Sequence, residues 1–207
     1  MTAKIRTLIA DDHAIVRMGL RSLVESESDI SIVGEASNGC EAVSMATKLT
    51  PDVVVMDLLM PNKDGVAATA EIVRHLPSAK IIILTSFGTS DGIAHALECG
   101  AAGVVLKSNA DMELVEAIRT VAKGGKFIPS AIKRQLSADP PIPMLTQRQL
   151  DILMAISRGF TNSDIAKMLG ITEITVRNHL TTIFAKTGAS SRAEAVATAI
   201  RKHLLEP

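Results

Sequence analysis

The chain has 207 residues, of which 47% are hydrophobic, so it is long enough for one or two domains with real cores. No apolar stretch approaches the roughly 18 residues that a membrane helix needs, and the N-terminal apolar run is too short for a signal peptide. These features, with two cysteines that lack metal-ligand spacing, predict a cytoplasmic protein with no membrane partner.

Charge is distributed unevenly along the chain. Residues 1–124 hold 11 basic and 16 acidic side chains, a net charge of −5, whereas residues 125–207 hold 11 and 6, a net charge of +5. An acidic part joined to a basic part indicates two tasks, with polyanion binding assigned to the second. A chance difference in charge between two domains is the alternative.

Strand and helix patterns alternate five times in the first part. The expected strands are 5–10, 30–35, 52–57, 80–85 and 103–106, and the expected helices are about 13–26, 39–49, 64–75, 90–99 and 110–123. Residues 53–56 are apolar on both faces, which is typical of a central parallel strand. The fold class predicted is therefore α/β, a five-stranded doubly wound parallel sheet in a domain spanning 1–124.

The alternation stops after residue 124. Residues 125–143 are expected to form a linker, because prolines favour an extended spacer in 138–143, and 130–137 suit a short helix before it. Residues 144–207 show only helical patterns, with starts at hydroxyl residues Thr146, Thr161, Thr172 and Ser191. Two of these helices flank a tight turn at Gly170, which predicts a small all-α helix-turn-helix domain over 144–207.

Chemically active side chains stand at the ends of four predicted strands. Asp11 and Asp12 follow the first strand, Asp57 ends the third, Thr85 ends the fourth and Lys107 follows the fifth. In a doubly wound sheet the carboxyl ends of the strands meet at one edge, where ligands bind. Paired carboxylates suit Mg²⁺, and Asp57 could either bind the metal or attack phosphorus as a nucleophile. The five side chains together predict a metal-assisted phosphoryl site.

These residues resemble the receiver domain of two-component response regulators, which has a flavodoxin-like fold. The match lies in Asp11-Asp12, in Asp57 with the following Leu-Leu-Met-Pro-Asn-Lys-Asp-Gly65, in Thr85-Ser86 and in Lys107. The resemblance implies that Asp57 accepts a phosphoryl group from a sensor histidine kinase. It also implies that Asp11, Asp12, Asp57 and the backbone carbonyl of Leu59 bind Mg²⁺. Val104 stands where many receivers have a switch aromatic, and Ser108 where many have proline.

The helical part resembles the LuxR-type effector domain, and the two domains together resemble the NarL/FixJ family. The match covers four stretches, which are 145–153, 159–166, 175–180 and 191–195. Arg177, Asn178 and Thr181 lie opposite an apolar stripe on helix 172–186, a face that suits the major groove of double-stranded promoter DNA. Arg177 could read guanine and Asn178 adenine. The expected phosphate contacts are Thr161, Thr175, Lys186 and Arg192.

The function predicted is that of a transcription factor that dimerises and binds promoter DNA when Asp57 is phosphorylated. Relatives dimerise through their last helix, here with Ala193, Val196, Ala197 and Ile200, although some of these must complete the monomer core. A haloacid-dehalogenase-type phosphatase is the first alternative, but it needs an acid at the position of Leu59. A DNA-binding protein that does not depend on phosphorylation is the second.

Two smaller predictions concern the surroundings of the site. Leu59 and Phe87 are apolar neighbours of Asp57 and Thr85, and we expect them to impede an attacking water and lengthen the lifetime of the phosphoryl group. The histidines outside the helical match, at 13, 75, 95 and 203, show no clustering along the chain, so no metal site built from them is expected.

Overall fold

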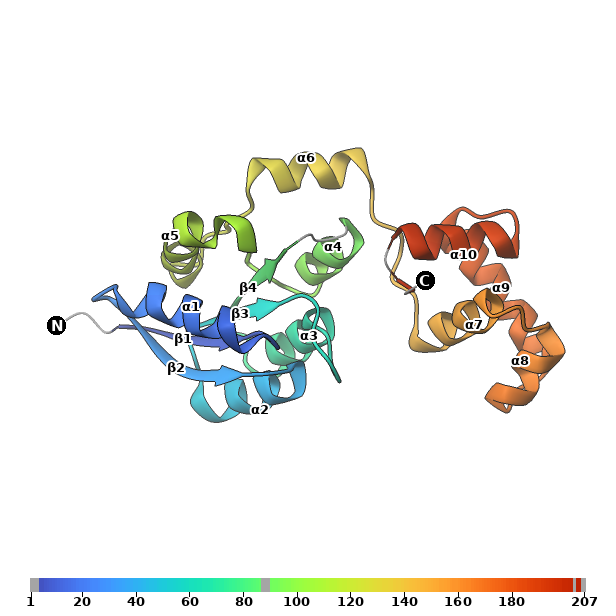
Figure 1. Ribbon diagram of the computed structural model, residues 1–207, viewed down its shortest axis with the longest axis horizontal. Coiled ribbons are helices and arrows are strands. Elements are labelled where there is room, and N and C mark those ends of the chain that lie inside the picture. Colours follow the sequence, from blue (N-terminus) through green and yellow to red (C-terminus); the bar gives the residue numbers. More distant parts are fainter. Residues whose placement is uncertain (1–3, 87–89, 203, 206–207) are drawn as a thin grey trace. The chain divides into compact units, whose positions relative to one another are not determined.

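The structure is a computed structural model that describes residues 4–86, 90–202 and 204–205 (Figure 1). The chain divides into two compact units, Met1–Asp139 and Pro140–Pro207. Among the described helices none is long and apolar enough to cross a membrane.

Strands and helices alternate in the first unit as the sequence patterns predict. In chain order they are β1 (Ile5–Ala10), α1 (Ala14–Glu25), β2 (Ile30–Ala36), α2 (Gly39–Leu49), β3 (Val53–Asp57), α3 (Gly65–His75), β4 (Lys80–Thr85), α4 (Ser90–Glu98), β5 (Gly103–Leu106), a short 3₁₀ turn (Lys107–Asn109), α5 (Ala110–Ala122) and α6 (Ser130–Ala138). The five strands form one parallel sheet in the order β2-β1-β3-β4-β5, which confirms the predicted fold class.

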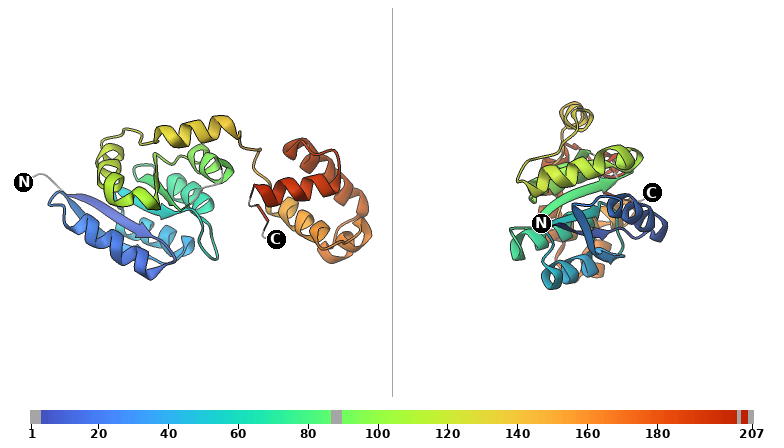
Figure 2. Two further views of the ribbon diagram at one scale, coloured as in Figure 1. Left: turned by 45° about the horizontal axis from the view of Figure 1, so that its top comes forward. Right: turned by 90° about the vertical axis from the view of Figure 1, so that its left-hand side faces the viewer.

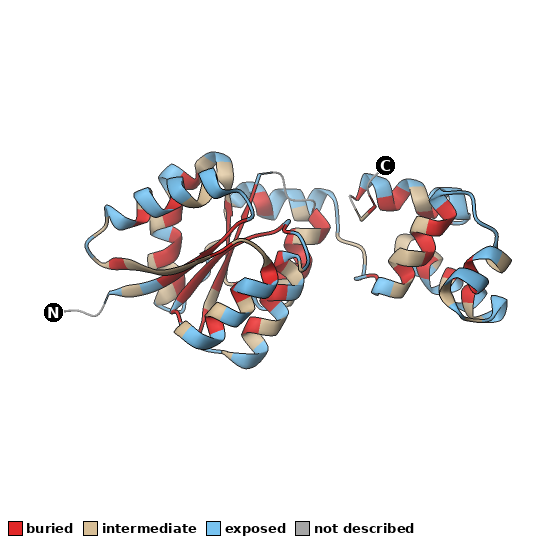
Figure 3. Cartoon of the chain, turned by 60° about the horizontal axis from the view of Figure 1, so that its bottom comes forward, coloured by how far each residue is buried: buried red, intermediate tan, exposed pale blue. Residues whose placement is uncertain are grey.

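The sheet lies between two layers of helices (Figures 1 and 2). Alternate residues of the central strands enter two separate apolar clusters, because successive side chains of a strand point to opposite faces. One cluster packs against α2, α3 and α4, and the other packs against α1 and α5. The central strands are buried along their length (Figure 3), as expected for a sheet covered on both faces.

The segment after α5 packs back against the sheet of the first unit. Phe127 forms a parallel bridge with Gly103, and the amide of Val104 donates to the Phe127 carbonyl at 2.8 Å. Ile132 of α6 is 1% exposed and belongs to the same apolar cluster as the α2–α4 face of the sheet. The helix foreseen over 130–137 is therefore present and anchored by a core residue.

The second unit contains four helices among its described residues. They are α7 (Gln147–Ser157), α8 (Asn162–Leu169), α9 (Glu173–Thr187) and α10 (Arg192–Arg201). Each begins after a side chain that caps the helix by accepting from a backbone amide, and these caps are the four hydroxyl residues predicted from the sequence. Gly170 closes α8 in the left-handed conformation, at φ 63°, and turns the chain into α9.

Candidate functional site

The pairing of the strands brings the predicted site residues to one edge of the sheet. Asp57 is in register with Leu84, the residue before Thr85, and Thr85 is in register with Leu106, the residue before Lys107. Asp11 directly follows β1, whose neighbour is β3. Because all strands are parallel, the predicted site residues Asp11, Asp57, Thr85 and Lys107 lie at the carboxyl edge, as the strand-end pattern predicts.

At this edge an ammonium group lies between two buried carboxylates. Asp11 is fully buried and Asp57 is 5% exposed. The Lys107 Nζ lies 2.6 Å from Asp11 Oδ2 and donates to Asp57 Oδ2 at 2.9 Å. Such short charge-assisted contacts are among the stronger polar interactions in proteins. Lys107 therefore ties the end of β5 to the ends of β1 and β3.

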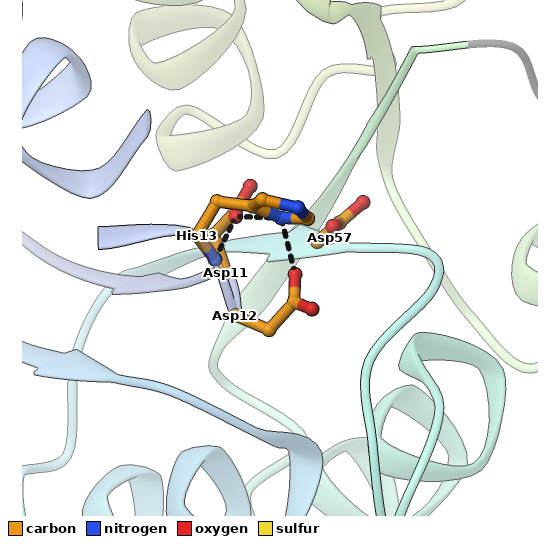
Figure 4. Close-up of side chains that lie close together, drawn as sticks. All are labelled: Asp11, Asp12, His13 and Asp57. Carbon is orange, nitrogen blue, oxygen red and sulfur yellow. Dashed lines mark hydrogen bonds and ion pairs between the residues drawn. The ribbon is translucent and has the colours of Figure 1, made fainter. Parts of the chain in front are cut away.

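Asp12 and His13 complete the cluster (Figure 4). The backbone amide of His13 donates to Asp11 Oδ1 at 2.8 Å, and the Nδ1 atom of the His13 ring lies 2.6 Å from Asp12 Oδ1. One ligand atom from each of Asp11, Asp12, His13 and Asp57 lies within 4.8 Å of the others. The spacing of the histidines along the chain does not predict this placement of His13, and the only sign of it in the sequence is its position directly after the acid pair.

The charges shift the ionisation of two groups. Burial raises the pKa of Asp57, and the nearby Asp11 carboxylate raises it further, while Lys107 and the Leu59 amide act in the opposite direction. For Lys107, burial lowers the pKa, but its contacts with Asp11 and Asp57 outweigh burial and leave the pKa raised. Lys107 thus stays charged, and the Asp57 carboxyl holds a proton more tightly in the folded chain than it would in water.

The donor set fits a hard divalent cation. Three carboxylates face a single ammonium group, so the cluster carries excess negative charge. The buried Asp11 Oδ2 has the Lys107 ammonium as its close partner, at 2.6 Å. A buried carboxylate oxygen of this kind is a suitable ligand for a cation that prefers oxygen.

The loop after β3 packs closely against the backbone of Asp57. The Gly65 amide donates to the Leu58 carbonyl at 2.9 Å, and a Cβ on Gly65 would lie only 2.2 Å from the Asp57 carbonyl oxygen. Only glycine fits there. Leu59 projects outward and is 70% exposed, while its amide hydrogen-bonds to the Asp57 carboxylate. Thr85 is buried at the end of β4, and Phe87 lies outside the described residues.

In the second unit the predicted reading residues share one exposed face of α9. Arg177, Asn178 and Thr181 are exposed, while Val176, Leu180 and Ile183 are buried against the other helices. Arg177 lies 3.8 Å from Glu173 one turn earlier, and both side chains are largely exposed. This face is free of core packing and is therefore available to a ligand.

The four predicted phosphate contacts are already engaged within the unit. The Lys186 ammonium donates to the Met144 carbonyl at 2.6 Å, and Arg192 donates to Asn162 Oδ1 at 2.8 Å. Thr161 forms a capping box with Asp164, and Thr175 shares a hydrogen bond with another threonine. Each of the four side chains is thus held by a partner within the second unit, and sequence spacing alone does not reveal these partners.

Helix α10 divides its small apolar residues between core and surface. Ala195 and Ala199 are buried in the core of the unit, as is Thr198. Of the four residues expected at a dimer contact, Val196 packs against this core, whereas Ala193, Ala197 and Ile200 are exposed. The core therefore takes up one of the four and leaves three at the surface.

The first unit has a cluster of acids and a lysine at the carboxyl edge of a β2-β1-β3-β4-β5 sheet, and a helix-turn-helix unit follows it. This is the architecture of a receiver domain joined to an effector domain. Comparison with known families agrees. Residues 7–119 match the response regulator receiver domain, and residues 143–199 match the bacterial regulatory proteins of the luxR family.

Individual relatives are similar over nearly the whole chain. The transcriptional regulatory protein LiaR of Bacillus subtilis is 41% identical, with 97% of this chain and 99% of LiaR covered. The response regulator protein VraR of Staphylococcus aureus is 36% identical, with 98% and 99% covered. A solved RcsB–DNA complex is 28% identical with a TM-score of 0.65, covering 95% of this chain and 98% of that one. The response regulator ChrA is 33% identical with a TM-score of 0.58, covering 98% and 100%.

The chain belongs to the two-component response regulators of the NarL/FixJ family, which join a receiver domain to a LuxR-type helix-turn-helix domain. It is a transcription regulator and not an enzyme. The phosphatase alternative, which the absence of an acid at Leu59 already weakened, is thereby set aside.

Proposed function

We propose that this response regulator switches its binding to promoter DNA through phosphorylation of Asp57 by a sensor histidine kinase. The observation that carries the proposal is the position of the Asp57 carboxylate, 2.9 Å from the Lys107 ammonium inside a cluster of acids. In the transfer, a carboxylate oxygen bonds to phosphorus as the bond between phosphorus and the kinase imidazole breaks. The electron pair of that bond stays on the imidazole nitrogen.

Asp11, Asp12, Asp57 and the Leu59 carbonyl would hold Mg²⁺, as the excess of carboxylates over ammonium groups in the cluster supports. When bound, the ion neutralises the oxygens of the incoming phosphoryl group. Lys107 is placed to pair with one of those oxygens as a point charge, and the Thr85 hydroxyl to hydrogen-bond to another. Both residues sit at the ends of adjacent strands, so a shift of either alters the β4–β5 edge.

The route from the site to the second unit is proposed to run through buried apolar contacts. Val104 is fully buried, in the cluster that also contains Ile93 of α4 and Ile132 of α6. Repacking of α4 and β5 would therefore reach α6 without a rotating aromatic ring, and α6 leads along the chain to the effector unit. We retain the division into a receiver domain (1–124), a linker (125–143) and a DNA-binding domain (144–207), with α6 as the docked part of the linker.

For DNA binding we propose that α9 enters the major groove, with Arg177, Asn178 and Thr181 at base edges. Thr161, Thr175, Lys186 and Arg192 would contact phosphates, and the exposed side of α10 would join two copies on neighbouring half-sites. The positive charge of residues 125–207 supports this assignment. A DNA partner implies action in the cytoplasm.

The proposal is tested by treating the full chain with acetyl phosphate or beryllofluoride in Mg²⁺. The wild type should gain the mass of one phosphoryl group with acetyl phosphate, form dimers and bind selected DNA more tightly. Asp57→Ala should show none of these responses, while Glu116→Ala, which removes an exposed acid of α5, should respond normally. Dimerisation and tight binding by Asp57→Ala equal to those of the phosphorylated wild type would refute the switch.

A further inference from the structure

Ile174 is an exposed apolar side chain on the proposed reading helix. It lies in the first turn of α9 and is 68% exposed. The buried residues of α9 in the core of the unit are Val176, Leu180 and Ile183, so Ile174 is not needed for core packing. A single exposed isoleucine can be accidental, and its position relative to its neighbours decides whether it matters.

Helical geometry places Ile174 within the proposed reading face. At about 100° per residue, Ile174 lies about 60° from Arg177 on one side and about 40° from Asn178 on the other. Thr181 follows two turns along the same face. Side chains at the N-terminal end of a recognition helix are those that reach base edges. Any duplex that meets Arg177 and Asn178 therefore also meets Ile174.

The chemistry of this side chain narrows what it could contact there. Ile174 has no donor or acceptor, so it can neither pair with phosphate nor hydrogen-bond to a base edge. The Glu173 carboxylate beside it also disfavours a phosphate oxygen at this position. In the major groove the C5-methyl group of thymine is the apolar feature that distinguishes one base from the others.

We propose that Ile174 is a specificity-determining residue that selects thymine at one position of each half-site by packing against its methyl group. This inference rests on the proposed use of α9 as the reading helix. It adds an apolar contact to the hydrogen-bonding residues Arg177 and Asn178, and it makes the preferred site depend on a group that carries no charge.

The test combines a protein substitution with removal of a single methyl group from DNA. Preferred duplexes are first selected with the full-length chain in beryllofluoride and Mg²⁺. Each thymine of the selected site is then replaced in turn by deoxyuridine, which differs only in lacking the C5-methyl group. Affinities of the wild type and of Ile174→Ala are measured for every duplex at one salt concentration.

At one thymine per half-site, loss of the methyl group should lower wild-type affinity about threefold to tenfold, the range expected for burying one methyl group. Ile174→Ala should bind the thymine and deoxyuridine duplexes at that position with affinities within about twofold of each other. Ile174→Val, which keeps the branched Cβ, should retain part of the preference. Melting temperature and dimer size of each variant are recorded alongside.

Met168→Ala is the matched control, because Met168 is also half exposed and apolar but lies in a cavity whose described lining includes no residue of α9. It should keep the full response to methyl removal. Equal methyl dependence in the wild type and Ile174→Ala at every thymine would overturn the inference while leaving DNA reading by α9 intact. A dimerisation defect in Ile174→Ala with unchanged methyl dependence would also overturn it. A wild type with no preferred sequence would refute both the inference and the proposed function.

Discussion

The charge balance at the carboxyl edge predicts that Asp57→Asn stabilises the chain when Mg²⁺ is absent. At an effective dielectric of about 20, the Lys107 ammonium at 2.9 Å attracts the Asp57 carboxylate by about 6 kcal/mol. Asp11, within 4.8 Å, repels it by about 3.5 kcal/mol or more. The remaining attraction, at most about 2.5 kcal/mol, is smaller than the several kcal/mol that burial of an ion costs, in agreement with the raised pKa of Asp57.

We expect a gain on the order of 1 kcal/mol at pH 7, the amount by which a burial cost of several kcal/mol exceeds the remaining attraction. For a unit of this size 1 kcal/mol raises the melting temperature by about 4 °C. The raised pKa means that the folded state holds the proton of Asp57 more tightly than the unfolded state does. The wild type is therefore not penalised below the unfolded pKa of about 3.9, and the penalty grows as pH rises towards the folded pKa.

The assay is thermal unfolding followed by circular dichroism in EDTA, because the chain has neither Trp nor Tyr to report by fluorescence. The melting temperature of Asp57→Asn should exceed that of the wild type at pH 7, and the difference should shrink towards pH 4. Asp12→Asn, at a more exposed acid, should show a smaller change. Added Mg²⁺ at ten times its dissociation constant should stabilise the wild type by about 1.4 kcal/mol and Asp57→Asn by less. A lower melting temperature for Asp57→Asn at pH 7 would show that Lys107 outweighs burial and refute the reasoning.

Three further outcomes are expected. Ile132→Ala should destabilise the first unit by about 2 to 4 kcal/mol in urea unfolding, or by the docking free energy of α6 if that is smaller; no change would mean that α6 is not held by its core residue. Leu59→Asn should shorten the phosphoryl half-life, measured by loss of label from the phosphorylated chain, and an unchanged half-life contradicts shielding by Leu59. Arg177→Ala should weaken binding to the selected site by about 1 to 3 kcal/mol and relax preference at one base pair, whereas Arg192→Ala should weaken all sequences alike and reduce the salt slope by about 1. Affinities are measured over a salt series. If Arg177→Ala weakened all sequences alike and Arg192→Ala relaxed the preference at one base pair, the assigned roles of the two arginines would be wrong.

Local pattern was enough to predict most of the fold. Runs such as 53–57 are apolar on both faces, and the helices between strands repeat at helical spacing, so each element can be recognised without knowing its neighbours. Strand-end chemistry was equally informative about Asp11, Asp57 and Lys107, because parallel strands present their carboxyl ends at one edge whatever the packing.

Other features depended on contacts between residues far apart in the chain. Ile132 anchors α6 in the core of the first unit, a contact that the helical pattern of residues 130–137 does not reveal. Lys186, expected to meet phosphate, is already bonded to Met144, 42 residues earlier. Such contacts follow from how helices pack, and periodicity along the sequence carries no record of them.

The sequence by itself therefore determined the two-part organisation, the parallel sheet and the identity of the acids, because hydrophobic period and strand-end chemistry are local properties. Only the tertiary structure decided that Lys107 bridges Asp11 and Asp57, that His13 joins the acids, and that Ile174 stays exposed between Arg177 and Asn178. Burial and charge balance depend on which distant side chains come together, and that is settled only when the sheet and helices pack.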